Sequence, residues 1–238
     1  MSAAAAAPSL VYRGPMRAVN GKKSEAGYTL AELMAAMAIT LILTGLAGKF
    51  LQGSFNVRFR EDERSFALAD AQRALNIMSR EVANSGFGLS NNGIVAADSG
   101  AAAIRVRANL NAFEGVTSSG SVSDPGEDIR YRLTRSGTNS YIERLDVNTG
   151  ARVAVLANRV DGFAVSYFAD KVSYTANNCV ITGSAAEVTD KKDARYVVIA
   201  VCVNLPARGT PGGTGYQPPS SVQLSSSVAL RNADLTRY

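Results

Sequence analysis

The acid–base and nucleophilic chemistry open to this chain of 238 residues is restricted by the lack of one residue type. The sequence has no histidine, which excludes imidazole catalysis, Ser-His-Asp triads and zinc sites built on histidine. The proline- and glycine-rich segment 206–219 lacks the lysine of a phosphate-binding loop, so we expect it to be a flexible surface loop. These features predict a protein that is not an enzyme, with no catalytic residue and no cofactor.

Two groups of charged side chains suggest binding sites, although we favour a simpler interpretation of both. Three carboxylates surround a Pro-Gly turn without the spacing of a calcium loop, so we expect a solvated turn and no metal site: Asp124, Glu127 and Asp128. Four arginines alternate with apolar residues, as on the solvent-facing side of a sheet: Arg105, Arg107, Arg130 and Arg132. A calcium site and a DNA-binding face are the alternatives, and we expect no nucleic-acid partner.

Glu32 is the only side chain that is charged at neutral pH in the apolar stretch 28–48, YTLAELMAAMAITLILTGLAG. As a helix this stretch would measure ~32 Å, which is enough to cross a membrane. The basic residues that precede it should stay in the cytoplasm, so the chain after Lys49 is predicted to be exported. A secretory signal peptide is less consistent, because no small-residue cleavage site follows the apolar core. A carboxylate within lipid is costly, which makes Glu32 a candidate functional residue.

Residues 22–33, KKSEAGYTLAEL, resemble the processing site of type IV prepilins and pseudopilins. The resemblance implies that a membrane prepilin peptidase cleaves after Gly27, reading Gly27 and the residues that follow it, and methylates the new terminal amine of Tyr28. Thr29 and Leu30 complete the implied processing site. Residues 1–27 would be the cleaved leader, which is longer than in many major pilins and carries two residues between its lysines and Gly27.

After this cleavage, Glu32 would be the fifth residue of the mature chain. The new amine of Tyr28 would be largely protonated near neutral pH, since the ordinary pKa of an α-amino group is about 8. In a bundle of packed helices, the Glu32 carboxylate of one subunit would pair with the Tyr28 amine of its neighbour, so that neither charge stays unpaired in an apolar environment. The alternative is a glutamate that merely extends toward the membrane interface.

The rest of the chain predicts an α+β fold, in which a long N-terminal helix packs on an antiparallel β-sheet domain, as in pilins. We expect an apolar membrane or filament-core helix over 28–53 and an amphipathic helix over 54–86, with glycines at 45, 48 and 53 as sites of bending or of close helix packing. One apolar stripe recurs at helical spacing: Leu68, Ala71, Leu75, Met78 and Val82.

Residues 87–238 are expected to form the β-rich exported domain. A hairpin over 129–134 and 141–145 is followed by strands near 152–157, 163–167, 195–205 and 222–231, most simply as a meander. The run 196–203 is apolar on both faces, as in a central strand.

The two cysteines, Cys179 and Cys202, both fall in the part predicted to be exported to an oxidising compartment. An even count without C-x-x-C spacing predicts one structural disulfide, which would hold the 169–194 loop on the sheet. The alternative is a buried Cys202 and a distant loop thiol at Cys179.

The exported domain has a second resemblance. The order of segments 160–167 (VDGFAVSY), 197–205 and 228–232 (VALRN) is similar to minor pilins of the PilW class and to their secretion-system relatives of the GspJ class. The resemblance implies a single-pass inner-membrane precursor with a cytoplasmic N-terminus and a periplasmic C-terminal domain. After processing, it would join a complex that primes type IV pilus assembly, and it would lie in the pilus filament or at its tip. Its partners would be other minor pilins, the major pilin and the pilus assembly platform. The alternatives are a type II secretion pseudopilin that contacts secreted substrates and a pilus-associated DNA or surface adhesin.

Overall fold

The computed structural model describes residues 27–112, 121–137, 139–155 and 160–233. The chain forms two compact units, one up to Ala47 and one from Gly48, which we describe separately. Of the predicted leader, 1–27, all but the last residue lies outside the described residues.

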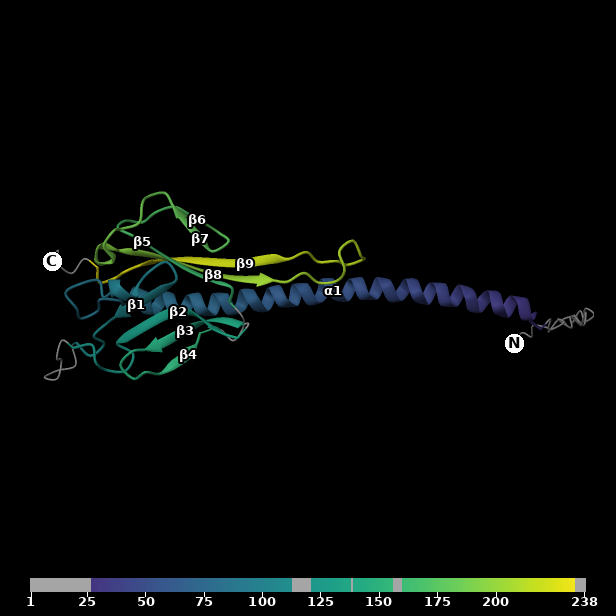
Figure 1. Cartoon of the computed structure of the whole chain (residues 1–238), viewed down its shortest axis with the longest axis horizontal. Helices are drawn as coiled ribbons and strands as arrows, with labels where there is room; N and C mark the ends of the chain where they lie inside the picture. The colour runs from purple at the N-terminus through teal and green to yellow at the C-terminus, as the bar shows by residue number, and fades with distance from the viewer. Residues whose placement is uncertain (1–26, 113–120, 138, 156–159, 234–238) are drawn as a thin grey trace, which may run out of the picture. The chain divides into compact units, whose positions relative to one another are not determined.

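The second unit combines the C-terminal part of helix α1 (Leu30–Ala83) with two main antiparallel sheets (Figure 1). One sheet has the order β1 (Ala103–Arg107), β2 (Asp128–Ser136), β3 (Asn139–Asp146) and β4 (Arg152–Ala154). The other has the order β5 (Gly162–Phe168), β8 (Tyr196–Leu205) and β9 (Ser220–Ala229), and a separate hairpin consists of β6 (Tyr174–Asn177) and β7 (Val180–Gly183). Two short 3-10 helices, η1 (Ala96–Asp98) and η3 (Lys191–Asp193), lie in the connections.

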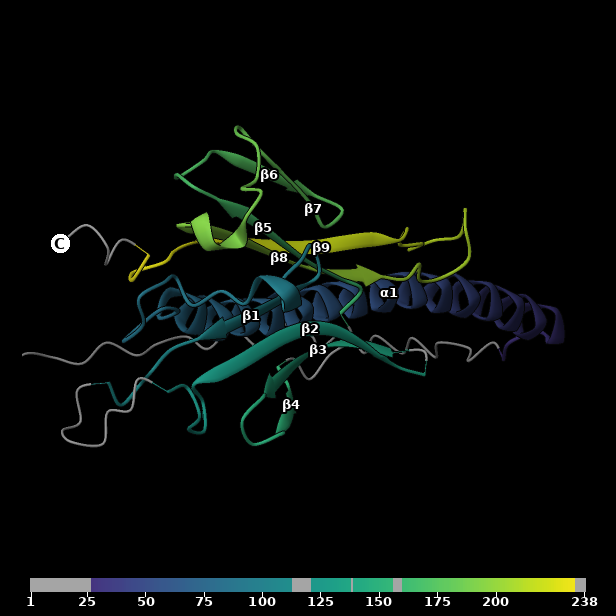
Figure 2. The same cartoon turned by 60° about the vertical axis from the view of Figure 1, so that its left-hand side comes forward.

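The predicted α+β fold is confirmed, with a long helix packed on antiparallel sheets. The expectation of a single meander is wrong, because the strands divide between two sheets that both bury their apolar faces against α1 (Figure 2). The alternation at Arg105 and Arg107 indicated a strand where β1 lies, whereas the hairpin β6–β7 was not predicted.

The face of α1 that packs into the core of this unit is lined by small and flexible side chains: Ala67, Ala71, Ala74, Leu75, Met78 and Val82. The predicted stripe is therefore correct from Ala71 onward and wrong at its first position, where Leu68 is 47% exposed and Ala67 is buried. At 3.6 residues per turn, position 67 lies one turn before 71 on the buried face, while position 68 has rotated away from it.

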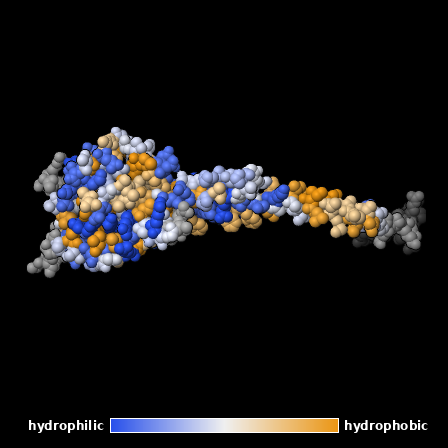
Figure 3. Space-filling view, viewed as in Figure 1, coloured by the Kyte–Doolittle hydropathy of each residue, from blue (hydrophilic) through white to orange (hydrophobic). Residues whose placement is uncertain are grey.

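The described part of the first unit, residues 27–47, consists of the start of α1 and the three residues before it. Its side chains are exposed and predominantly apolar (Figure 3). By length and composition, α1 is the one helix of the described residues that could cross a membrane. The hydroxyls of Thr40 and Thr44 donate to carbonyls one turn earlier, so neither needs water as an acceptor. The helix is continuous through the glycines at 45, 48 and 53.

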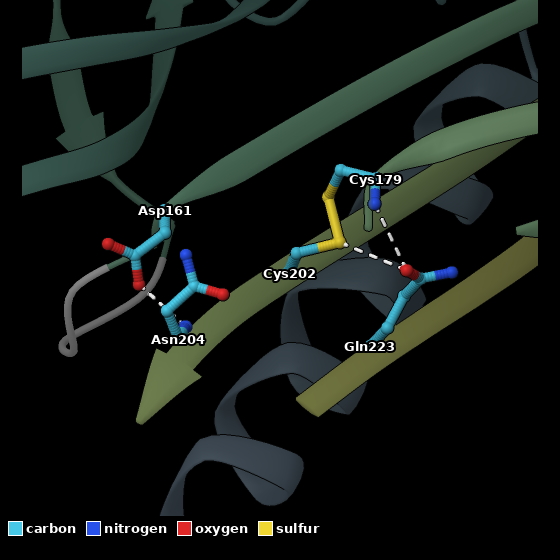
Figure 4. Close-up of a disulfide and its surroundings, with 5 residues drawn as sticks. All are labelled: Asp161, Cys179, Cys202, Asn204 and Gln223. Atoms are coloured by element: carbon cyan, nitrogen blue, oxygen red, sulfur yellow. Dashed lines mark hydrogen bonds between the residues drawn. A yellow bond between two sulfur atoms is a disulfide. The ribbon is translucent and has the colours of Figure 1, made fainter. Parts of the chain in front are cut away.

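Strand β8 is the central strand of its sheet and is buried on both faces, as predicted. One face joins the core beside α1. On the other face, the disulfide between Cys179 and Cys202 ties the β6–β7 turn to β8, with Cα atoms 5.8 Å apart (Figure 4). The predicted disulfide is confirmed, and part of the segment expected as a loop is a hairpin.

The backbone around this disulfide is adapted to it. Cys179 has a left-handed backbone conformation (φ 59°) that cysteine seldom adopts, and its N–H donates to Gln223 Oε1 at 3.1 Å (Figure 4). Gly162 lies opposite Cys202 in the β5–β8 register, and a Cβ there would lie 2.6 Å from Cys179 Sγ. Only glycine therefore leaves room for the disulfide at position 162.

The segment 206–219 is a largely exposed surface loop, as expected, but it is anchored to α1, which was not expected. The Arg60 side chain, which is almost fully buried, donates to the carbonyl oxygens of Pro206, at 2.6 Å, and of Pro218. Gly215 has φ +75°, and a Cβ there would lie 2.3 Å from a backbone atom of α1. The sequence hid this anchoring because its donor is 146 residues away from the acceptor at Pro206.

Replacing both cysteines with serine is expected to lower the free energy of unfolding by about 3 kcal/mol, because the bond closes a loop with a sequence separation of 23. Urea unfolding of the purified wild-type chain and of the double variant, followed by circular dichroism, measures the difference. Alkylation of the unreduced wild type under denaturing conditions is the control. Two alkylated cysteines in that control would contradict the disulfide.

Candidate functional site

The predicted processing site lies directly before the start of α1. Gly27, Tyr28 and Thr29 are exposed and non-helical, and Tyr28 is 89% exposed. A Cβ built on Gly27 would have no atom within 4 Å. The Gly27–Tyr28 peptide bond is therefore at an exposed, non-helical position that a protease could reach.

A capping box between Thr29 and Glu32 determines where the helix begins. Thr29 Oγ1 accepts a hydrogen bond from the Glu32 N–H (3.2 Å), and Glu32 Oε2 accepts from the Thr29 N–H (2.9 Å) and from its hydroxyl (3.1 Å). These reciprocal bonds satisfy donors that the first turn of a helix otherwise leaves free. The carboxylate also lies at the positive end of the helix dipole.

Glu32 thus has a role within its own chain that we did not infer from the sequence. The signal was present, since Thr29-Leu30-Ala31-Glu32 has the T-x-x-E spacing of a capping box. The cap uses Oε2 alone, so among the described residues Oε1 has no hydrogen-bond partner. That oxygen is the atom available to a cation from outside the chain, and its pairing with a neighbour's Tyr28 amine stays a prediction.

Of the three carboxylates around the Pro-Gly turn, only Asp124 is exposed as we expected. Glu127 and Asp128 are buried, with residue exposures of 1% and 2%. Glu127 accepts hydrogen bonds from the backbone N–H groups of Leu110 (2.8 Å) and Asp124 (3.0 Å), so its carboxylate joins these two segments of the chain. Within the described part of the chain, no group of three or more His, Cys, Asp or Glu side chains could hold a metal ion.

The arginines considered as a DNA-binding face are paired with carboxylates of the same region. Arg105 donates to both carboxylate oxygens of Asp128, at 2.7 and 2.8 Å, and Arg107 donates to one of them at 2.7 Å. Burial alone would raise the pKa of Asp128, but the hydrogen bonds from both arginines outweigh it and hold that pKa below its usual range. The other two arginines are also paired: Arg130 with Asp98 at 3.3 Å and Arg132 with Glu143 at 3.2 Å. The four arginines share three carboxylates, Asp98, Asp128 and Glu143, which offset most of the positive charge that could bind a phosphate backbone.

Comparisons with known proteins point to the N-terminal segment. Residues 22–48 match the family model described as the prokaryotic N-terminal methylation motif. No curated protein matches the chain. Among solved structures, the chain is similar to a type IV-like pilin, TTHA1219 from Thermus thermophilus, with 14% identity and a TM-score of 0.38 over 69% of this chain and 97% of that one. Neither match is to an enzyme. Residues 22–48 therefore carry an N-terminal methylation motif of the prepilin type.

Proposed function

We propose that this chain is the precursor of a minor pilin, cleaved by a prepilin peptidase between Gly27 and Tyr28. It then joins a complex that primes type IV pilus assembly or lies at the filament tip. The observation that carries the proposal is an exposed Gly27–Tyr28 bond directly before a capped, apolar helix, inside the segment that matches the methylation motif. The order of segments 160–167, 197–205 and 228–232 fits both the PilW and GspJ classes, and we assign the chain to the PilW class on its terminal Leu230-Arg231-Asn232.

The proposed location follows from charge and length. The basic residues before the apolar segment stay in the cytoplasm, residues 28–53 lie first in the inner membrane and then in the filament core, and the following domain is periplasmic. A disulfide in that domain suits an oxidising compartment. The partners in this proposal are the other minor pilins, the major pilin and the assembly platform.

Processing is tested at Gly27. The Gly27→Leu variant is expected to stay uncut because the peptidase reads a small residue at this position, whereas Gly27→Ala is expected to be cut. The surroundings of Gly27 are open, so neither side chain disturbs the described fold. Intact-mass measurement should show loss of residues 1–27 and a methylated Tyr28 in the wild type and in Gly27→Ala. A wild-type chain that keeps its leader, or that is cut after residue 48, would refute the assignment.

Assembly is tested at Glu32, where two variants separate helix capping from charge pairing. Glu32→Gln keeps an oxygen that accepts from the Thr29 N–H but removes the charge, whereas Glu32→Ala removes both. If Glu32 pairs with a neighbour's amine, both variants are processed normally and co-purify with the other minor pilins at least about tenfold less, since losing one partner of a buried ion pair costs about 3–5 kcal/mol.

The matched control is Glu61→Gln, which changes an exposed glutamate further along the same helix and should leave co-purification unchanged. Wild-type co-purification of Glu32→Gln together with a loss for Glu32→Ala would mean that Glu32 acts only as a helix cap. Wild-type levels for both variants would remove Glu32 from assembly.

Deletion of the chain distinguishes a pilus subunit from a secretion pseudopilin. The proposal predicts loss of surface pili, measured by shearing and immunoblotting, with unchanged export of secreted proteins. Normal pili with a loss of secretion would instead assign the chain to the GspJ class. Re-expression of the wild-type chain in the deletion strain is the control.

A further inference from the structure

Strand β9 is a long, regular edge strand without the features that usually protect such edges. All ten of its residues pair with β8 in one continuous register, so no bulge interrupts it. Its sequence, SSVQLSSSVA, contains neither a charged residue nor a proline. Natural proteins commonly place charges, prolines or bulges on edge strands, because an open edge is a template for pairing with another chain.

The other edges of the two main sheets are short or covered. Residues 93–100 cover β1 through backbone bonds and isolated bridges. On the outer side of β5, Val165 donates to the carbonyl of Ala101, and Val188 donates to that of Tyr167. β4 has three residues and begins with Arg152. The open edge of β9 is thus the exception among the described strands of these sheets.

The backbone of β9 makes no hydrogen bond to the rest of the described chain apart from those to β8. One set of its N–H and C=O groups therefore faces outward along the edge. The side chains alternate: Val222 and Val228 are buried toward α1, whereas Ser225 and Ser227 are exposed. The serine side chains are small, so they leave the edge sterically accessible. Because β9 carries no charge, an incoming strand meets no like charge along it.

The direction of β9 restricts what can pair with it. Three hydrogen bonds, in the same order along both elements, join β9 and its flanking residues to α1: Arg60 to Pro218, Ser79 to Ser226 and Arg231 to Ala83. β9 therefore runs parallel to α1. Two copies joined antiparallel through their β9 edges would have oppositely directed 48–83 helix segments, whereas the subunits of a helical filament all have the same polarity.

We propose that the open edge of β9 accepts an extended, uncharged strand from a different pilin-like subunit anchored in the same membrane. The inference rests on the proposed function and adds to it a contact within the exported domain. Backbone hydrogen bonds along the edge supply the affinity of such strand addition, and the alternating side chains supply its selectivity. The added strand extends the sheet β5–β8–β9 by a fourth strand.

The test uses the full-length chain in membranes, with the photo-crosslinking residue p-benzoylphenylalanine at position 227. A second variant carries it at position 225. Other pilin-like proteins of the same cell, each with a methylation motif and an affinity tag, are co-expressed with each variant one at a time. We expect a photo-adduct with one of them that maps by mass spectrometry to an uncharged, extended segment. The paired substitution Ser225→Lys with Ser227→Lys should reduce co-purification with that subunit about tenfold by placing charges along the edge.

The matched control is Ser173→Lys with Ser184→Lys, which adds the same charge to two exposed serines beside the β6–β7 hairpin and should leave co-purification unchanged. Both lysine variants must keep the Cys179–Cys202 disulfide, which monitors folding. Adducts to a second copy of this chain, adducts to a partner's helix, or the absence of adducts would each overturn the proposal. Co-purification that depends on Glu32 and is unchanged by the β9 lysines would refute the edge contact and leave the proposed function intact.

Discussion

The architecture of the second unit depends on one face of α1, where the side chains must be small enough for two sheets to pack closely against the helix. The residues of α1 at this face include Ala67, Ala71 and Ala74, so the helix contributes little volume. The sheets contribute the bulk, through fully buried side chains such as Tyr131 and Tyr167. Since protein interiors are close-packed, large residues from the sheets fit where the helix is small. A larger side chain at Ala71 or Ala74 would separate α1 from both sheets at once.

A polar contact fixes the first sheet to this helix face. The Glu81 carboxylate of α1 accepts a 2.5 Å hydrogen bond from the Tyr131 hydroxyl of β2 and bonds of 2.9 and 3.1 Å from Arg144 of β3. Burial, reinforced by the negative charge of Glu81, raises the pKa of Tyr131, so its hydroxyl remains a donor. Apolar packing is non-directional, whereas these bonds specify one orientation of the sheet on the helix.

Features set by local sequence were predictable, and features set by distant partners were not. Helical spacing locates the buried face of α1 from Ala71 to Val82, and the apolar run 196–203 identifies β8 as a central strand, because both signals lie within one element. The burial of Asp128 and the anchoring by Arg60 depend on partners that only the fold brings together, so the sequence made these segments look solvated. The capping box at Thr29 is also local, and the T-x-x-E spacing of residues 29–32 is sufficient to predict it.

The cap at Thr29 also bears on how a processed N-terminus would be prepared for assembly. Its hydrogen bonds form within one chain, so the first turn of α1 and the carboxylate of Glu32 are ordered before any neighbour arrives. Under the proposed cleavage, the new amine lies one residue before the capping threonine, at the start of a turn whose conformation is already set. A neighbour's amine would then meet a carboxylate with one oxygen engaged and one oxygen open. Less conformational entropy is lost on pairing with a preorganised group than with a freely rotating one. A side chain that caps its own helix is for this reason better suited to pairing between subunits than an uncapped glutamate at the same position.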